Sequence, residues 1–180
     1  MTELSLHILD VAKNSTAAKA SLVEITVDED TKNNRLTISI NDDGCGMSPD
    51  LLKRVRDPFT TTRTTRKVGL GIPLFEQAAL QAGGGFDIIS AEGSGTCVTA
   101  WFVHDSIDRQ PLGDMPSTIS ALIMGSPEID FIYRHAVNEK DFTLDTREVR
   151  QILQGVPLDN IDVIAWISEF ITENSNSLRR

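Results

Sequence analysis

The chain has 180 residues, of which 40% are hydrophobic and 24% charged, and its formal net charge is -9. These values are typical of one folded domain with a sizeable core, and they exclude a disordered chain. The acidic balance argues against nucleic acid as a partner, because its phosphates would be repelled. Cys45 and Cys97 are too few for a disulfide framework, and no Cys/His spacing suits zinc.

Nothing in the sequence predicts insertion into a membrane. The first residues lack a basic region followed by a continuous apolar run, so we expect no signal peptide. No apolar run reaches the roughly 18 residues that span a bilayer. We therefore expect a cytoplasmic location.

The first elements are predicted to be an amphipathic helix and a strand hairpin. The helix is expected over residues 3–19. Leu4, Ile8, Val11 and Ser15 recur at helical spacing and so share one face of it. A separate polar stripe carries His7, Asp10 and Asn14. Residues 21–28 and 35–41 alternate between apolar and polar side chains, which predicts two strands joined by a turn.

Glycine-rich segments and a basic loop follow this hairpin. The loop DDGCG at residues 42–46 comes directly after the second strand, and Ser48 is the expected N-cap of a short helix. Residues 56–68 are polar and non-periodic, which predicts a loop. The segment Gly69-Leu70-Gly71 then leads into a helix expected over about 72–82.

Two further strands, 86–91 and 96–103, are expected with a turn at residues 92–95. Between residues 105 and 116 the composition shifts to Pro, Gly and Asp, which indicates a boundary. We therefore divide the chain into a domain of residues 1–104 and an extension of residues 105–180.

The extension predicts an αββαα order. A short helix is expected near 117–124, and a hairpin pairs 128–137 with 141–145. A helix begins at Thr146, and the last helix covers about 160–173. The extension has a net charge of -6 and lacks clustered nucleophiles, bases and metal ligands. We expect it to cover the sheet or to form a protein interface.

Charge points to an anion site in the first domain. Residues 53–67 carry six basic residues and one acid, a net charge of +5 on an otherwise acidic chain. A solvated basic loop would give the same pattern. The threonines and cations of this loop suit a triphosphate, as do the backbone N–H groups at the start of the helix that follows.

Asp10, Asn14 and Asp42 are the candidate polar groups of such a site. The Asn14 amide oxygen could coordinate magnesium, which prefers oxygen ligands, and Asp10 could accept a proton from water. Asp42 could accept a hydrogen bond from the exocyclic amine of a nucleobase, with Gly44 and Gly46 allowing a ring to approach the backbone. Taken singly, each of these residues could equally be a surface helical or turn residue.

In their order and spacing, five motifs together resemble the GHKL ATPases, which include sensor histidine kinases, gyrase B, MutL proteins, large heat-shock chaperones and anti-sigma kinases. The resemblance covers residues 3 to about 104 and implies a Bergerat-type α/β sandwich, in which helices cover one mixed sheet. The motifs are Asn14, NDDGCGM at 41–47, PFTTTR at 58–63, GLGI at 69–72 and EGSGT at 92–96.

The resemblance implies ATP and Mg²⁺ as cofactors. Asn14 matches the residue that holds magnesium, and Asp42 the one that contacts the adenine amine. Thr96 matches the threonine that supports this aspartate. The remaining ATP-binding positions lie in the glycine loop, the lid over 56–68 and the glycines after it. They are Gly44, Gly46, Thr61, Thr62, Arg63, Lys67, Gly69, Leu70 and Gly71.

Two departures from the family pattern concern activity. Hydrolytic members carry a glutamate as general base at the position of Asp10, which is one methylene shorter. The chain also lacks the helical pair that presents a phosphoacceptor histidine. We expect slow magnesium-dependent hydrolysis or phosphoryl transfer to a partner protein, with Asp10 as the catalytic residue. The alternative is a nucleotide-gated binding module with little turnover.

Overall fold

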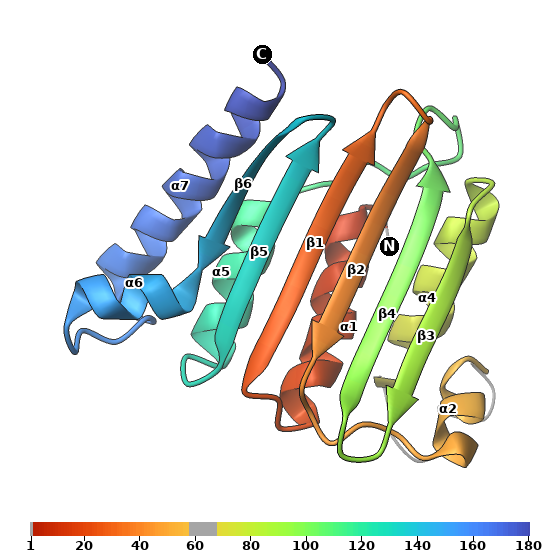
Figure 1. Ribbon diagram of the computed structural model, residues 1–180, viewed down its shortest axis with the longest axis horizontal. Coiled ribbons are helices and arrows are strands. Elements are labelled where there is room, and N and C mark those ends of the chain that lie inside the picture. The colour runs from red at the N-terminus through yellow and green to blue at the C-terminus, as the bar shows by residue number, and fades with distance from the viewer. Residues whose placement is uncertain (1, 58–67) are drawn as a thin grey trace.

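Six strands form a single sheet in the computed structural model, which describes residues 2–57 and 68–180 (Figure 1). Their spatial order is β3-β4-β2-β1-β5-β6. Only β1 and β5 run parallel among neighbouring strands, so the sheet is mixed, as the family resemblance implied. The strands are β1 (Leu22–Asp30), β2 (Arg35–Asp42), β3 (Gly85–Ala91), β4 (Gly95–Val103), β5 (Asp130–Val137) and β6 (Lys140–Asp145).

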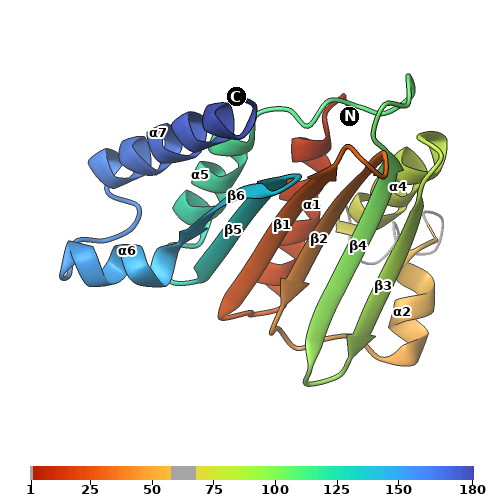
Figure 2. The same ribbon diagram turned by 45° about the horizontal axis from the view of Figure 1, so that its top comes forward.

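Four helices, in the order α4, α1, α5 and α7, pack side by side across one face of this sheet, and Figure 2 shows them behind the strands in an oblique view. None of the helices in the described ranges is both long and apolar enough to cross a membrane. The helices are α1 (Leu4–Ala17), α2 (Pro49–Val55), α4 (Val68–Gln81), α5 (Met115–Gly125), α6 (Thr146–Leu153) and α7 (Ile161–Leu178).

The core lies between the sheet and these helices. Leu4, Ile8 and Val11 of α1 are buried, which confirms the apolar face expected from their spacing. Alternate residues of β1 and β2 are buried beneath them. Each buried aliphatic side chain stabilises the fold by roughly 1.5–3 kcal/mol, so this layer holds α1 firmly on the sheet. The polar stripe of α1 is therefore presented at a fixed position.

Local capping follows the sequence closely. The Ser48 hydroxyl accepts a hydrogen bond from the Leu51 N–H, and Pro49 occupies the first turn of α2. Asp145 accepts a hydrogen bond from the Arg147 N–H at the start of α6. These side chains satisfy N–H groups that have no partner within the helix, so both helices begin where the sequence predicts.

The C-terminal segment shares the sheet of the first hundred residues. Strand β5 pairs in parallel with β1, and α5 packs against α1. The connector before α5 passes over the start of α1, where the N–H groups of Leu4 and Ser5 donate to the carbonyls of Pro111 and Leu112. These are first-turn donors without helical partners, so the connector completes the N-terminus of α1.

A buried carboxylate joins β1 to three other parts of the chain. Glu29 Oε2 lies 2.6 Å from His135 Nε2 on β5 and 3.0 Å from Arg179 Nη2 after α7. Its other oxygen lies 3.0 Å from His104 Nε2, just after β4. Burial alone would raise the pKa of Glu29, but these hydrogen bonds and the Arg179 charge outweigh it and lower the pKa to about 2.

This lowered pKa predicts a loss of stability in acid. The unfolded chain binds a proton at Glu29 near pH 4.5, before the folded chain does. The free energy of unfolding therefore decreases as pH falls from 4.5 towards 2. We expect Glu29→Gln to lose about 1–3 kcal/mol at pH 7 and to show a flatter decline below pH 5. Urea unfolding at several pH values measures this, with exposed Glu139→Gln as the control. Parallel declines for the parent and Glu29→Gln would contradict the assignment.

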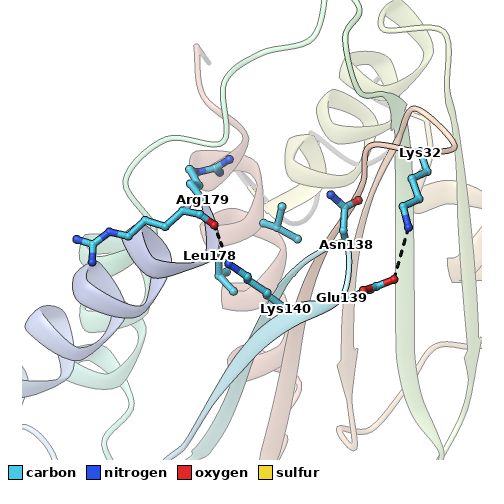
Figure 3. A pocket seen from close by; sticks show the side chains of 8 residues that line it. Lys32, Asn138, Glu139, Lys140, Leu178 and Arg179 are labelled. Carbon is cyan, nitrogen blue, oxygen red and sulfur yellow. Dashed lines mark hydrogen bonds and ion pairs between the residues drawn. The ribbon is translucent and has the colours of Figure 1, made fainter.

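The end of α7 is fastened to the sheet beside a pocket of about 550 Å³. The Lys140 ammonium donates a hydrogen bond to the Arg180 carbonyl oxygen at 2.7 Å. On the opposite side, Lys32 Nζ lies 3.5 Å from Glu139 Oε1. Figure 3 shows both lysines directed at these partners. The β1–β2 turn, the β5–β6 turn and the chain end thus meet at one corner of the molecule.

Candidate functional site

Asp42, the last residue of β2, is buried and held by two hydrogen bonds. Its Oδ2 accepts from the Ser15 hydroxyl on α1 at 2.6 Å, and its Oδ1 accepts from the Gly44 N–H at 2.8 Å. About 8% of its surface stays accessible. Each carboxylate oxygen has a second lone pair, so the oriented carboxylate can still accept a hydrogen bond from a ligand.

The neighbouring Asp43 has a different, structural role. Its carboxylate accepts hydrogen bonds from the Ser21 hydroxyl and from the N–H groups of Ser21 and Leu22, at the start of β1. These bonds lower the pKa of Asp43, the one from the Ser21 hydroxyl most. Asp43 therefore fixes the chain entering the sheet, which leaves Asp42 as the carboxylate available to a ligand.

The glycine loop after β2 is pressed between two backbone segments. The Cys45 N–H donates to the Ala18 carbonyl at the end of α1, and the Cys45 carbonyl accepts from Gly93 in the β3–β4 turn. Gly46 has φ +71°, and a Cβ there would overlap the Ala91 carbonyl. Glycine is needed at this position for its left-handed backbone and its lack of a side chain.

A row of polar side chains crosses three neighbouring strands at the end of the sheet where β2 finishes. In the sheet register Asp42 stands opposite Thr96 on β4, and Thr96 stands opposite Ser90 on β3. The Ser90 and Thr96 hydroxyl oxygens are 2.8 Å apart. Ser90 also donates to the Gly95 carbonyl and accepts from the Met47 N–H. The structure thus brings Thr96 beside Asp42, and Ser90 connects these strand ends to the glycine loop.

Asp10 and Asn14 lie one turn apart on α1, and both side chains are partly exposed. Within residues 2–57 and 68–180, neither side chain has a hydrogen-bond partner. The N-terminal part of α4 passes close to them, since a Cβ on Gly71 would stand 3.4 Å from the Asp10 Cβ. The structure therefore places Gly71 against Asp10, one helical turn from Asn14. Ser15, the residue after Asn14, links α1 to Asp42.

His7, on the same stripe, is a packing residue. It is buried and its ring stacks on Phe75 of α4, with centroids 5.5 Å apart. Its Nε2 lies 3.1 Å from the Gln110 side-chain oxygen, whereas its Nδ1 has no partner among the described residues. Burial lowers the pKa of His7. The ring is therefore neutral near pH 7 and joins α1, α4 and the connector.

The start of α4 differs from the sequence prediction. The helix begins at Val68 rather than near residue 72, so Gly69, Leu70 and Gly71 form its first turn. Pro73 lies inside the helix and has no N–H to donate to the Gly69 carbonyl four residues earlier. Glycine and an internal proline both disfavour a helix in an isolated chain. Tertiary packing against α1 overrides both.

Four of the expected ligand residues lie outside the described residues, namely Thr61, Thr62, Arg63 and Lys67. Shortly before these residues, Arg56 forms an ion pair with Glu76 of α4. Its Nη2 lies 2.5 Å from Glu76 Oε2. That contact raises the pKa of Arg56. Arg56 is therefore committed to holding the end of α2 against α4.

The donor set suits magnesium only in part. Among the described residues, no three His, Cys, Asp or Glu side chains are grouped to hold a metal ion. Asn14 nevertheless offers an amide oxygen without a described partner, next to the Asp10 carboxylate. Mg²⁺ is commonly bound through one or two protein oxygens, with phosphates and waters completing its shell. These residues therefore fit a magnesium ion that arrives with a phosphate ligand.

Two site residues were missed by the sequence reasoning, namely Ser15 and Ser90. Ser15 was placed on the apolar face of α1 without a role, although a buried hydroxyl needs a hydrogen-bond partner. That polar residue on an apolar face was a usable signal. Ser90 had no such signal, because its role depends on the register between β3 and β4.

Residues 1–106 match the family described as histidine kinase-, DNA gyrase B- and HSP90-like ATPase. This match covers more than half of the 180 residues, so the chain belongs to this family. The resemblance and the fold class inferred from the sequence are confirmed.

Three curated relatives each match a little more than half of the chain. A putative sensor protein of Shewanella frigidimarina is 31% identical over 101 residues, which are 56% of this chain and 15% of that protein. An uncharacterized sensor-like histidine kinase of Rhizobium meliloti is 33% identical, over 53% of this chain and 19% of that protein. Sensor histidine kinase ZraS of Salmonella typhi is 30% identical, over 54% and 21%. The chain thus spans about a fifth or less of these relatives.

Two solved structures share the fold across more of the chain. The N-terminal domain of a DNA repair protein has a TM-score of 0.53 and 14% identity, covering 81% of this chain and 53% of that one. The MutL ATPase domain of Aquifex aeolicus, solved with ADP, has a TM-score of 0.51 and 17% identity. It covers 86% of this chain and 70% of that one. The fold likeness therefore extends beyond residue 106 into the C-terminal segment.

Proposed function

We propose that the chain binds ATP or ADP with magnesium, with the adenine amine donating to Asp42. The observation that carries this proposal is the Asp42 carboxylate, buried at the C-terminal end of the central strand β2 and held by Ser15 and Gly44. A carboxylate fixed in this way accepts a hydrogen bond at little cost in ordering, because its orientation is already set. Gly46 packs so closely on the chain that a Cβ there would overlap the Ala91 carbonyl, which holds the glycine loop beside this carboxylate.

The phosphates then extend towards α1 and the first turn of α4. Backbone N–H groups at the start of α4, in Gly69, Leu70 and Gly71, favour phosphate binding. The Asn14 amide oxygen holds magnesium, which would neutralise phosphate charge when bound. Thr61, Thr62, Arg63 and Lys67 supply the remaining hydroxyls and cations. Thr96 supports Asp42 from the neighbouring strand.

Calorimetric titration of the full chain with ATP, with and without magnesium, tests this proposal. We expect saturable binding of one nucleotide, with magnesium increasing the affinity. Asn14→Ala should remove most of the gain that magnesium gives, whereas Asn176→Ala on α7 should leave it unchanged. Absence of ATP binding would overturn the proposed function. An unchanged magnesium effect in Asn14→Ala would overturn the role of Asn14.

The bound nucleotide is either slowly hydrolysed or supplies a phosphoryl group to a partner protein. Asp10 is the general base of this proposal, because it lies on the stripe of Asn14 and against Gly71. A second function is favoured by the absence of any described hydrogen bond that orients Asp10. In that case ATP would gate a protein-binding surface with little turnover. Release of phosphate, or labelling of an added protein, over hours with magnesium and ATP separates the two.

The proposal also covers the division of the chain, its partners and its location. We assign residues 1–104 to nucleotide binding and residues 105–180 to an extension that extends the sheet and contacts a protein. The acidic charge disfavours nucleic acid as a partner. A cytoplasmic location fits a chain that meets ATP.

A further inference from the structure

Exposed apolar side chains gather around α6 and the start of α7. Ten large apolar residues of the described chain are exposed, and four of them lie within fifteen consecutive residues. They are Ile152 (76% exposed), Val156 (44%), Ile161 (82%) and Trp166 (48%). Large apolar patches on a protein surface commonly mark interaction sites.

Two of these side chains, Ile152 and Trp166, line a groove between the two helices. It has a volume of about 290 Å³ and is lined by Val149, Ile152 and Leu153 of α6 and by Asp162, Val163 and Trp166 of α7. The Trp166 ring stacks on Phe170, with centroids 5.3 Å apart. That contact keeps a rigid aromatic wall on the α7 side, so the groove is suited to receive apolar side chains in one defined position.

The α7 side of the groove carries only negative charge. Asp162, Glu169 and Glu173 fall on the same stripe of α7 as Trp166, at helical spacings of four, three and seven residues. In the part of the chain that the structure describes, none of these three carboxylates is paired with a cation. The helix α7 contains no basic residue.

The nearby arginines do not compensate for this charge. Arg147 of α6 is paired with Asp145, and Arg150 is paired with Asp130 and also donates to two backbone carbonyls. A second copy of this chain would bring the same carboxylates together across the contact, and like charges disfavour that arrangement. Charge complementarity therefore selects a basic partner.

We propose that this groove binds a basic amphipathic helix of a partner protein. Apolar residues at helical spacing would enter the groove against Ile152 and Trp166, while Lys or Arg beside them would meet Asp162 and Glu169. Such helix-in-groove recognition requires only a few anchors. Figure 1 places α6 and α7 at the β6 edge of the sheet, whereas α2 and α4 lie at the β3 edge. The partner therefore leaves the candidate nucleotide site accessible.

A designed peptide with leucine at helical spacing and lysine elsewhere provides the probe. Trp101→Phe leaves Trp166 as the only tryptophan of the chain, so its fluorescence reports on the groove. We expect saturable binding of one peptide with a shift of Trp166 emission to shorter wavelength. A peptide with glutamate in place of lysine should not bind. The double substitution Asp162→Lys and Glu169→Lys, or Ile152→Ser alone, should weaken binding about tenfold or more.

Matched substitutions elsewhere separate this site from general attraction to an acidic protein. Asp28→Lys with Asp108→Lys changes the net charge equally, at exposed positions away from α6 and α7, and should change affinity less than twofold. Circular dichroism confirms folding of each variant. Three results would overturn the proposal: no saturable binding, equal weakening by the distant pair, or dimerisation of the chain that Ile152→Ser abolishes. None of these results bears on nucleotide binding.

Discussion

Replacing Asp42 with asparagine should weaken ATP binding by roughly tenfold to a hundredfold, the loss expected for a hydrogen bond to a charged group. The amide keeps the size of the carboxylate but replaces one acceptor oxygen with a donor. The Gly44 N–H needs an acceptor at this position, and so does the adenine amine. Only one oxygen remains to serve them. Calorimetry with magnesium and ATP measures the change.

One further variant tests whether the orientation of the Asp42 carboxylate matters, and a second serves as the control. Ser15→Ala removes the hydroxyl that holds Asp42 Oδ2, so it should weaken ATP binding by less than Asp42→Asn. Asp28→Asn makes the same chemical change on an exposed part of β1 and should leave affinity unchanged. If Asp42→Asn binds ATP as tightly as the parent while remaining folded, Asp42 does not contact the base.

Asp10→Asn should reduce any ATP hydrolysis by ~10²-fold or more, the typical loss for a positioned base. The substitution keeps size and polarity but removes the basic oxygen, so ATP affinity should stay within severalfold of the parent. Asp10→Glu should preserve or raise the rate if the reach of the side chain is limiting. Phosphate release under excess ATP and magnesium gives the rates, and calorimetry gives the affinities.

Asp108→Asn on the connector is the matched control and should hydrolyse ATP at the parental rate. A parental rate in Asp10→Asn would show that Asp10 is not the base. Its carboxylate would then position water or magnesium, and the nucleotide-gated binding module would become the better account of the chain.

Local signals predicted individual elements well, because each depends on neighbours in sequence. Alternating apolar residues located β1 and β2, and Ser48 and Asp145 marked the starts of α2 and α6. The start of α4 could not be found in this way, since its first turn is held against α1 rather than by its own sequence. Nor could alternation show that β5 would pair with β1, because a strand pattern does not specify its neighbour.

Site residues that belong to sequence motifs were predicted, whereas a residue that joins the site through strand register was missed. Asp42, Gly44 and Gly46 form the expected loop beside Thr96. Ser90 joins them only because β3 and β4 pair in one particular register. The groove between α6 and α7 could not be predicted from the sequence either, because the exposure of Ile152 and Trp166 depends on how the two helices pack.

Comparison of ATP with inosine triphosphate tests the central claim most directly. The two nucleotides share ribose, phosphates and magnesium chemistry, but inosine carries a carbonyl oxygen where adenosine carries the amine. Against the fixed Asp42 carboxylate this oxygen meets another acceptor, so calorimetry with magnesium should show ATP binding at least tenfold more tightly. Equal affinity for the two nucleotides would contradict adenine recognition by Asp42.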